Sequence, residues 1–183
     1  ANGSKKVGIF CSHLGPGEAS LYALTLLKGL NAIGVECYLI CDSYASDDMQ
    51  KQVSSLANKL VSLPKGIEKA SANIRALNLD VLVYCENLHN TKSPPIVFAM
   101  QRLSPIQVAM PSTLTRETFK TIDILIRHKN TDNSQENKVD NPSNTLVEVG
   151  HLGDAYLTEL QGNTDLSIPS RQDLGLGPKD ILF

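Results

Sequence analysis

The segment from Leu79 to Cys85 constrains the fold of this chain more than any other. Six of its seven residues are apolar, and polar residues follow it directly. A strand of a half-exposed sheet would alternate apolar and polar side chains. A nearly continuous apolar run of this length instead favours a parallel strand that is covered on both faces. The sequence therefore predicts a sheet with its central strand fully buried.

Short apolar runs and amphipathic helical segments alternate along the rest of the chain. The expected strands are 7–11, 35–41, 60–61, 79–85, 106–110, 122–126 and 146–149. The expected helices are 19–30, 46–56, 67–77 and 93–103, and Gly34 is the glycine cap that ends the first. Units of strand, helix and strand join parallel strands through right-handed crossovers. We therefore expect an α/β fold with a doubly wound, Rossmann-like parallel sheet over residues 5–150.

Residues 151–183 do not continue this alternation. Residues 151–169 show no sustained periodicity, and 170–176 are typical of a capped helical turn that ends at glycine. Residues 180–183 begin another apolar run. We expect 151–183 to be a linker followed by the start of a second domain that lies beyond this chain.

Composition and charge argue against several classes of protein. The chain of 183 residues has 17 Lys and Arg against 19 Asp and Glu, whereas a nucleic-acid-binding domain normally has a basic face. No apolar run approaches the roughly 18 residues of a membrane span, and the first residues do not resemble a signal peptide. The four cysteines are Cys11, Cys37, Cys41 and Cys85. Their apolar surroundings and lack of paired spacing favour buried thiols in a reducing compartment, which predicts a cytoplasmic protein without a metal site.

Ligands of a doubly wound sheet bind beyond the carboxyl ends of the strands, where the strand order reverses. The candidate substrate-binding residues there are Gly15, Gly17, Glu18 and Ser20 in the first turn, Glu86 and His89 after the fourth strand, and Ser112 and Thr113 after the fifth. Glycines allow a ligand to approach the backbone, and N–H groups at a helix start favour an anion or a hydroxyl group. The alternative is a tight turn in which Glu18 only complements the helix dipole.

His13, in the same first turn, is the candidate catalytic residue. Its imidazole can take a proton from an acceptor hydroxyl or amide near neutral pH. A histidine in a turn is also commonly a polar surface residue without a chemical role. The nearby glycines Gly15 and Gly17 lack the third glycine of the dinucleotide fingerprint and the Gly-Lys-Ser/Thr of a P-loop.

Three parts of the chain resemble the O-linked N-acetylglucosamine transferase family and the related bacterial protein N-glycosyltransferases. Residues 79–84 followed by 98–108 resemble the family's "D-V-L-V-Y/D" and "A-x-R-L-A-P-V-Q-V", and the match is closest from Arg102 to Val108. Residues 17–37 resemble the first strand-helix unit of GT-B glycosyltransferases in general. Residues 170–180 resemble the entry of these enzymes into their donor-binding domain.

The resemblance implies one half of a GT-B two-domain architecture, in which the first Rossmann-like domain mainly binds the acceptor. The second domain, outside this chain, would bind a nucleotide sugar, here a UDP-sugar. The implied activity is transfer of a sugar, N-acetylglucosamine or a hexose, to a protein or small-molecule acceptor without a metal or cofactor. His13 is the only histidine near the place where the family has one, and these 183 residues by themselves are expected to be inactive.

Two other interpretations remain open. Ala109-Met110-Pro111 stands where that family has Gly-His-Pro, which favours a noncatalytic Rossmann-like binding or regulatory module. The second interpretation is that the chain is the nucleotide- or dinucleotide-binding domain of a different enzyme.

Overall fold

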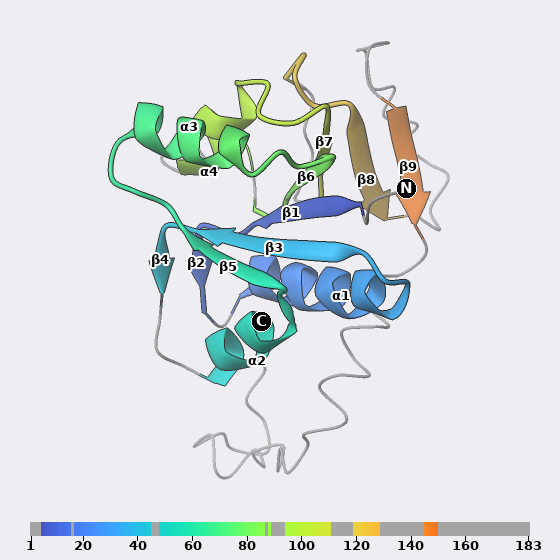
Figure 1. The fold of residues 1–183 in the computed structure, drawn as a ribbon. Helices are drawn as coiled ribbons and strands as arrows, with labels where there is room; N and C mark the ends of the chain where they lie inside the picture. The colour runs from blue at the N-terminus through green and yellow to red at the C-terminus, as the bar shows by residue number, and fades with distance from the viewer. Residues whose placement is uncertain are drawn as a thin grey trace, which may run out of the picture. The chain divides into compact units, whose positions relative to one another are not determined.

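The computed structural model describes residues 5–15, 17–44, 48–86, 88, 94–110, 119–128 and 145–149. Its strands are β1 (Lys6–Phe10), β2 (His13–Leu14), β3 (Glu36–Cys41), β4 (Ser43–Tyr44), β5 (Lys59–Ser62), β6 (Val81–Tyr84), β7 (Ile106–Ala109), β8 (Ile124–His128) and β9 (Thr145–Val149). Its helices are α1 (Glu18–Ala32), α2 (Asp48–Leu56), α3 (Ile67–Ala76) and α4 (Pro94–Ala99). The predicted α/β, Rossmann-like class is confirmed, because seven of these strands form one parallel sheet with helices on both faces (Figure 1). The expectations for residues 151–183 lie outside the described residues.

The order of the strands indicates where a ligand would bind to this sheet. The sheet runs β5-β3-β1-β6-β7-β8-β9, so the chain starts in its middle, winds outward to β5 and then returns to β6. Strands β1 and β6 are neighbours, with Val7 opposite Val81 and Phe10 opposite Tyr84. The direction of winding therefore reverses between β1 and β6, and ligands of such sheets bind beyond the carboxyl ends of the strands at this point.

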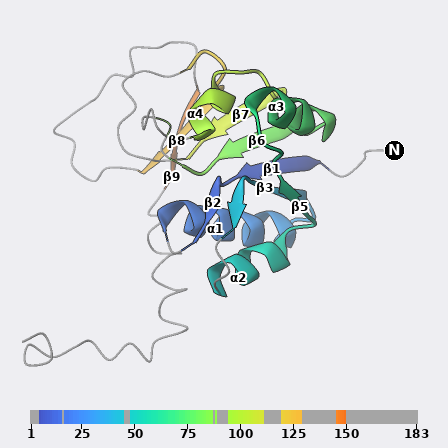
Figure 2. The same ribbon diagram turned by 90° about the vertical axis from the view of Figure 1, so that its left-hand side faces the viewer.

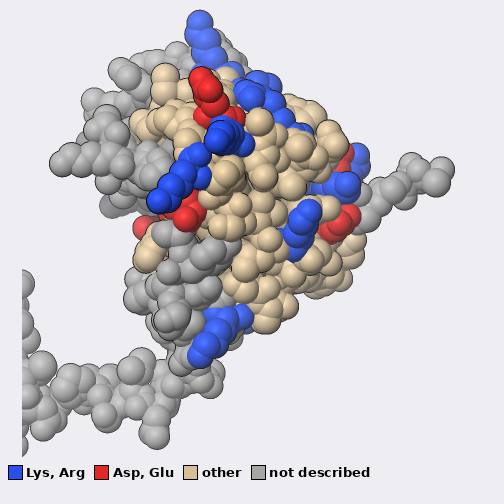
Figure 3. All heavy atoms as spheres, turned by 60° about the vertical axis from the view of Figure 1, so that its left-hand side comes forward, with Lys and Arg blue, Asp and Glu red and all other residues tan. Residues whose placement is uncertain are grey.

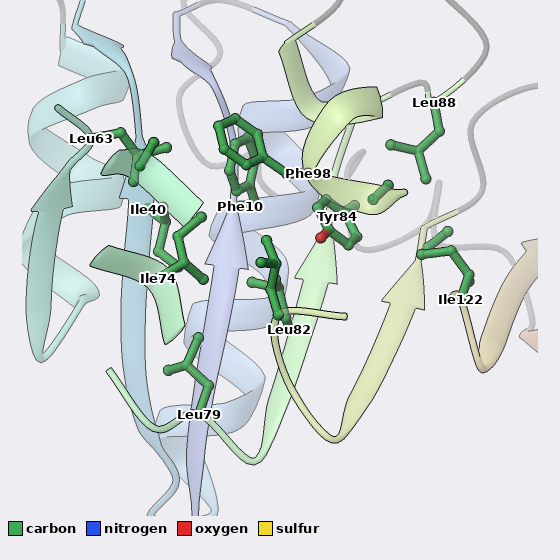
Figure 4. Packing of buried hydrophobic residues seen from close by; sticks show 14 of the residues in the cluster. Phe10, Ile40, Leu63, Ile74, Leu79, Leu82, Tyr84, Leu88, Phe98 and Ile122 are labelled. Carbon is green, nitrogen blue, oxygen red and sulfur yellow. The ribbon is translucent and has the colours of Figure 1, made fainter. Parts of the chain in front are cut away.

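One face of the sheet packs against α3 and α4 (Figure 1). Phe10 lies at the centre of this layer, with its ring centroid 5.3 Å from that of Phe98 and 5.7 Å from that of Tyr84. Leu82 and Ile74 extend the same buried cluster (Figure 4). Because side chains alternate along a strand, the intervening residues of the central strands face α1 instead.

Helix α1 covers that second face and ends at Ala32, and Gly34 forms its glycine cap, as predicted. Gly34 has a φ of +76°, a backbone region that glycine adopts without the penalty other residues incur. The Gly34 N–H donates to the Asn31 carbonyl at 3.0 Å, and the Val35 N–H donates to the Leu30 carbonyl at 3.1 Å. This pair of bonds is the Schellman motif, which satisfies carbonyls at the helix end.

All four cysteines are buried, as predicted. Phe10 of β1 pairs with Ile40 of β3 and with Tyr84 of β6. The residues that follow these three are cysteines, so a row of thiols crosses the three strands: Cys41, Cys11 and Cys85. Burial raises the pKa of the Cys11 thiol to about 12, and it raises the pKa of Cys85 well above its ordinary value. Thiols in this environment stay protonated and unreactive at neutral pH.

The expected helix 93–103 is wrong at its C-terminal end, because α4 stops at Ala99. The Leu103 N–H donates to the side-chain oxygen of Gln107 at 3.0 Å instead of to a helix carbonyl. The strand predicted from Ile122 begins two residues later, at Ile124. The Ile122 N–H donates to the Phe119 carbonyl and closes a turn. Ile122 is therefore a buried residue of the turn that precedes the strand.

Both basic and acidic side chains lie on the one face of the molecule that Figure 3 shows. On the face seen in Figure 3, lysine and arginine side chains are separated by uncharged surface and by acidic groups. Among the helices that the structure describes, none combines the length and the apolar character that a membrane crossing requires.

Candidate functional site

The chain does not turn directly from β1 into α1. It first forms β2, which pairs in parallel with β4 beyond the carboxyl end of β3 (Figure 2). The Asp42 N–H donates to the Ser12 carbonyl at 3.2 Å, which extends the contact between the two segments. This small second sheet was not predicted, because two-residue strands leave no periodic pattern in a sequence. It fixes the path of the backbone that carries His13.

Glu86 reaches across the point where the strand order reverses. Its Oε1 atom accepts the Ser12 hydroxyl at 2.6 Å and the His13 N–H at 3.3 Å. Ser12 and Glu86 are 74 positions apart in the sequence. Ser12 is the second residue after β1 and Glu86 is the second residue after β6, and these two strands are neighbours in the sheet. The structure therefore brings together two of the predicted site residues, His13 and Glu86, and leaves the His13 side chain exposed.

The environment of Glu86 acts on its ionisation in two directions. Burial disfavours the charged form and raises the pKa of this carboxyl, and the nearby Asp42 adds to the increase. Hydrogen bonds from the Ser12 hydroxyl and from the Ser12 and His13 amides oppose it, since they favour the ionised form. Glu86 is thus a partly buried carboxylate that the turn after β1 solvates.

The raised pKa of Glu86 makes a prediction about stability. A carboxyl whose pKa is higher in the folded state stabilises the fold most at acid pH, and this contribution is lost as pH rises through the folded value. Glu86→Gln keeps an oxygen acceptor without the charge. We expect its free energy of unfolding, measured by urea unfolding, to rise relative to that of the wild type as pH increases above 4.5, the ordinary pKa of glutamate. Glu68→Gln, an exposed position in α3, is the control, and a pH-independent difference for Glu86→Gln would contradict this expectation.

The glycines and Ser20 of the first turn occupy different environments. Ser20 is only 1% exposed, and its hydroxyl accepts the Gly15 N–H at 3.1 Å. Gly17 is the N-cap of α1 in an extended conformation, and a Cβ added there would meet no atom within 4 Å. The fold therefore does not itself require glycine at position 17, whereas Ser20 holds the turn together. A substrate-binding role for these residues stays a prediction.

Glu18 is an exposed residue in the first turn of α1. The Tyr22 hydroxyl donates to its carboxylate at 2.6 Å, which holds the negative charge near the positive end of the helix dipole. The structure is thus consistent with the alternative interpretation of Glu18, in which its carboxylate complements the dipole of α1. His89, Ser112 and Thr113 lie outside the described residues.

Ser12 is the residue of this site that the sequence analysis missed. It is 7% exposed and provides the hydroxyl that binds Glu86. Its position directly after the first apolar strand was the available signal, because polar residues at strand ends lie where ligands bind.

The segment with the closest family resemblance, Arg102 to Val108, connects α4 to β7 and enters that strand from its amino end. Gln107 is fully buried, and its Oε1 atom accepts the Leu103 N–H at 3.0 Å and the Tyr84 hydroxyl at 3.4 Å. Its Nε2 atom donates to the carbonyls of Gln101 at 3.0 Å and Thr121 at 2.8 Å. Both donors and both acceptor directions of the amide are therefore used.

Arg102 and Asp123 complete this arrangement. The Arg102 guanidinium pairs with the Asp123 carboxylate, which also accepts the Gln107 N–H at 2.7 Å. Partial burial opposes ionisation of Asp123, but these two hydrogen bonds outweigh it and hold the pKa of the carboxyl below its usual value. The Arg102–Val108 segment thus fixes the connections around β7, and it does so away from the candidate site.

Across the residues that the structure describes, His, Cys, Asp and Glu side chains form no group of three or more that could hold a metal ion.

No protein-family model matches the chain, and no curated protein matches it by sequence. A solved structure that it resembles is a lysine-to-methionine mutant of the O-GlcNAc transferase of Thermobaculum terrenum. The TM-score is 0.61, the sequence identity is 16%, and the match covers 80% of this chain and 28% of that enzyme. The chain therefore has the fold of one part of a GT-B glycosyltransferase and spans under a third of the enzyme's length.

Proposed function

We propose that this chain forms the acceptor-binding half of a glycosyltransferase that uses a nucleotide sugar, a UDP-sugar, as donor. The observation that carries the proposal is the contact beyond the carboxyl ends of β1 and β6, where the backbone N–H of the exposed His13 binds Glu86 in a sheet with a GT-B-like fold. Acceptors are recognised by hydroxyl and amide groups, and the polar groups that meet there are suited to such a ligand.

The chemical step that we propose uses His13 as a general base. Its imidazole takes the proton from an acceptor hydroxyl or amide while that oxygen or nitrogen attacks the anomeric carbon of the sugar. The bond from this carbon to the diphosphate breaks as the new glycosidic bond forms, and the nucleoside diphosphate leaves with its electron pair. Groups outside these 183 residues would stabilise the diphosphate. Glu86 acts on the backbone of His13 and thereby sets where the imidazole stands.

The proposal is tested by measuring sugar transfer from a set of UDP-sugars, both with this chain and with the complete reading frame that encodes it. We expect transfer by the complete protein and none by the 183 residues alone. His13→Ala in the complete protein should lower kcat about 100-fold, since a positioned base typically contributes at least that factor. Asn73→Ala, at an exposed position of α3, is the matched control.

Turnover by the 183 residues alone would contradict the proposed division of the active site, and full activity of His13→Ala would remove this residue from catalysis. One observation favours a second candidate, a noncatalytic binding module. Met110, 4% exposed, stands where the resembled family has histidine, and its N–H binds the Tyr84 carbonyl at 3.0 Å. A complete protein that binds an acceptor but transfers no sugar from any donor would support this alternative.

A further inference from the structure

The turn after β1 already binds an anion that belongs to the chain itself. In nucleotide-binding sheets of this type, N–H groups of the first strand-to-helix turn receive the phosphates of the ligand. Here the His13 N–H donates to the Glu86 carboxylate at 3.3 Å, and the Ser12 amide also favours its ionised form. The Ser12 hydroxyl adds a third donor at 2.6 Å. Glu86 thus occupies three donors of the segment between β1 and α1, so an anionic ligand that approached Ser12 and His13 would find these donors already used.

We propose that Glu86 is a specificity-determining residue, whose carboxylate occupies these donors so that the site excludes phosphorylated ligands and accepts an uncharged polar one. That the uncharged ligand is a sugar acceptor rests on the proposed function. The exclusion of phosphate rests only on the contacts of Glu86.

A neighbouring carboxylate strengthens the exclusion. Asp42 follows β3 and is close enough to Glu86 to disfavour its ionisation. A phosphate approaching Glu86 would meet the like charges of Glu86 and Asp42 and would find the amides of Ser12 and His13 already bonded, and both effects discriminate against it. An uncharged hydroxyl or amide ligand instead gains carboxylate acceptors for its donors.

The test is a titration of the 183-residue protein with inorganic phosphate and, separately, with UDP, followed by the amide resonances of Ser12 and His13 in NMR spectra. We expect no saturable shift at these amides in the wild type. Glu86→Ala vacates the amides and removes the charge, so both probes should bind at least about tenfold more tightly than in the wild type. Glu86→Gln removes the charge but keeps the side chain, so its affinity should fall between the two, and it serves in place of alanine if that variant does not fold. Glu68→Gln removes one charge from the first turn of α3 and should behave as the wild type.

Saturable binding of UDP or phosphate at these amides in the wild type would overturn the proposal, as would a folded Glu86 variant with no gain in affinity. The titration does not depend on sugar transfer. A complete protein that transfers no sugar would therefore defeat the proposed function and leave the exclusion of phosphate standing. Conversely, binding of UDP at Ser12 and His13 of the wild type would contradict the exclusion of phosphate, and it would leave the result of the sugar-transfer assay unchanged.

Discussion

Replacing Gln107 with leucine is expected to lower the free energy of unfolding by about 4 kcal/mol. The substitution keeps most of the volume but removes an amide whose four hydrogen-bonding directions are all used. It would leave the Leu103 N–H and the carbonyls of Gln101 and Thr121 without this partner, and each such buried group costs roughly 1–3 kcal/mol. Urea unfolding of the variant and the wild type measures the difference.

Gln52→Leu provides the matched control, because the same chemical change occurs on the exposed side of α2. Its effect should stay within about 0.5 kcal/mol, as for most surface substitutions. A Gln107→Leu variant as stable as the control would show that the buried amide network contributes nothing to the fold.

Replacing Gly8 with valine should cost about 3 kcal/mol, near the upper end of the usual range for overpacking. A Cβ at position 8 would lie 2.4 Å from the Cδ1 atom of Leu79, 3.0 Å from that of Leu82 and 3.2 Å from that of Ile40. The Leu79 methyl group is the far end of a side chain, but all three leucine and isoleucine side chains are buried in one cluster, so a rotation of one displaces others. Valine adds two further carbon atoms in the same space. Thermal and urea unfolding report the loss.

Gly29→Ala is the control for this prediction. Gly29 is exposed within α1, and a Cβ there would meet no atom within 4 Å. Alanine should therefore raise stability by roughly 0.5–1 kcal/mol through its higher helix propensity. If Gly8→Val proved no less stable than wild type, the close packing of Leu79, Leu82 and Ile40 over β1 would be refuted.

The sequence predicted the sheet because most of its strands are apolar runs with a signal of their own. The run 79–85 and the run 35–41 both became central strands, β6 and β3. The C-terminal end of α4 was not predictable in the same way. Beyond the helix the Leu103 N–H donates to the side chain of Gln107, and no local pattern reveals a bond to an amide four residues further along the chain.

The candidate site was predictable in its parts and not in its connections. His13 and Glu86 each follow an apolar run, and this is visible in the sequence. The hydrogen bonds between their segments exist because β1 and β6 are neighbours, which depends on the strand order. The segment of closest resemblance, from Arg102 to Val108, makes hydrogen bonds that hold the connections around β7 in place. Its resemblance therefore indicates the fold and not the chemistry of the candidate site.

The row formed by Cys11, Cys41 and Cys85 has a consequence for measuring the dynamics of this protein. A reagent that modifies thiols needs a deprotonated and accessible sulfur atom. All three side chains of this row are buried, and burial also raises the pKa of Cys11 and Cys85, so the row resists modification while the sheet is closed. Modification therefore proceeds only through molecules in which β1 has separated from its neighbours or from α1. Its rate reports how often the sheet opens, so the natural chain contains its own label for native-state exchange experiments.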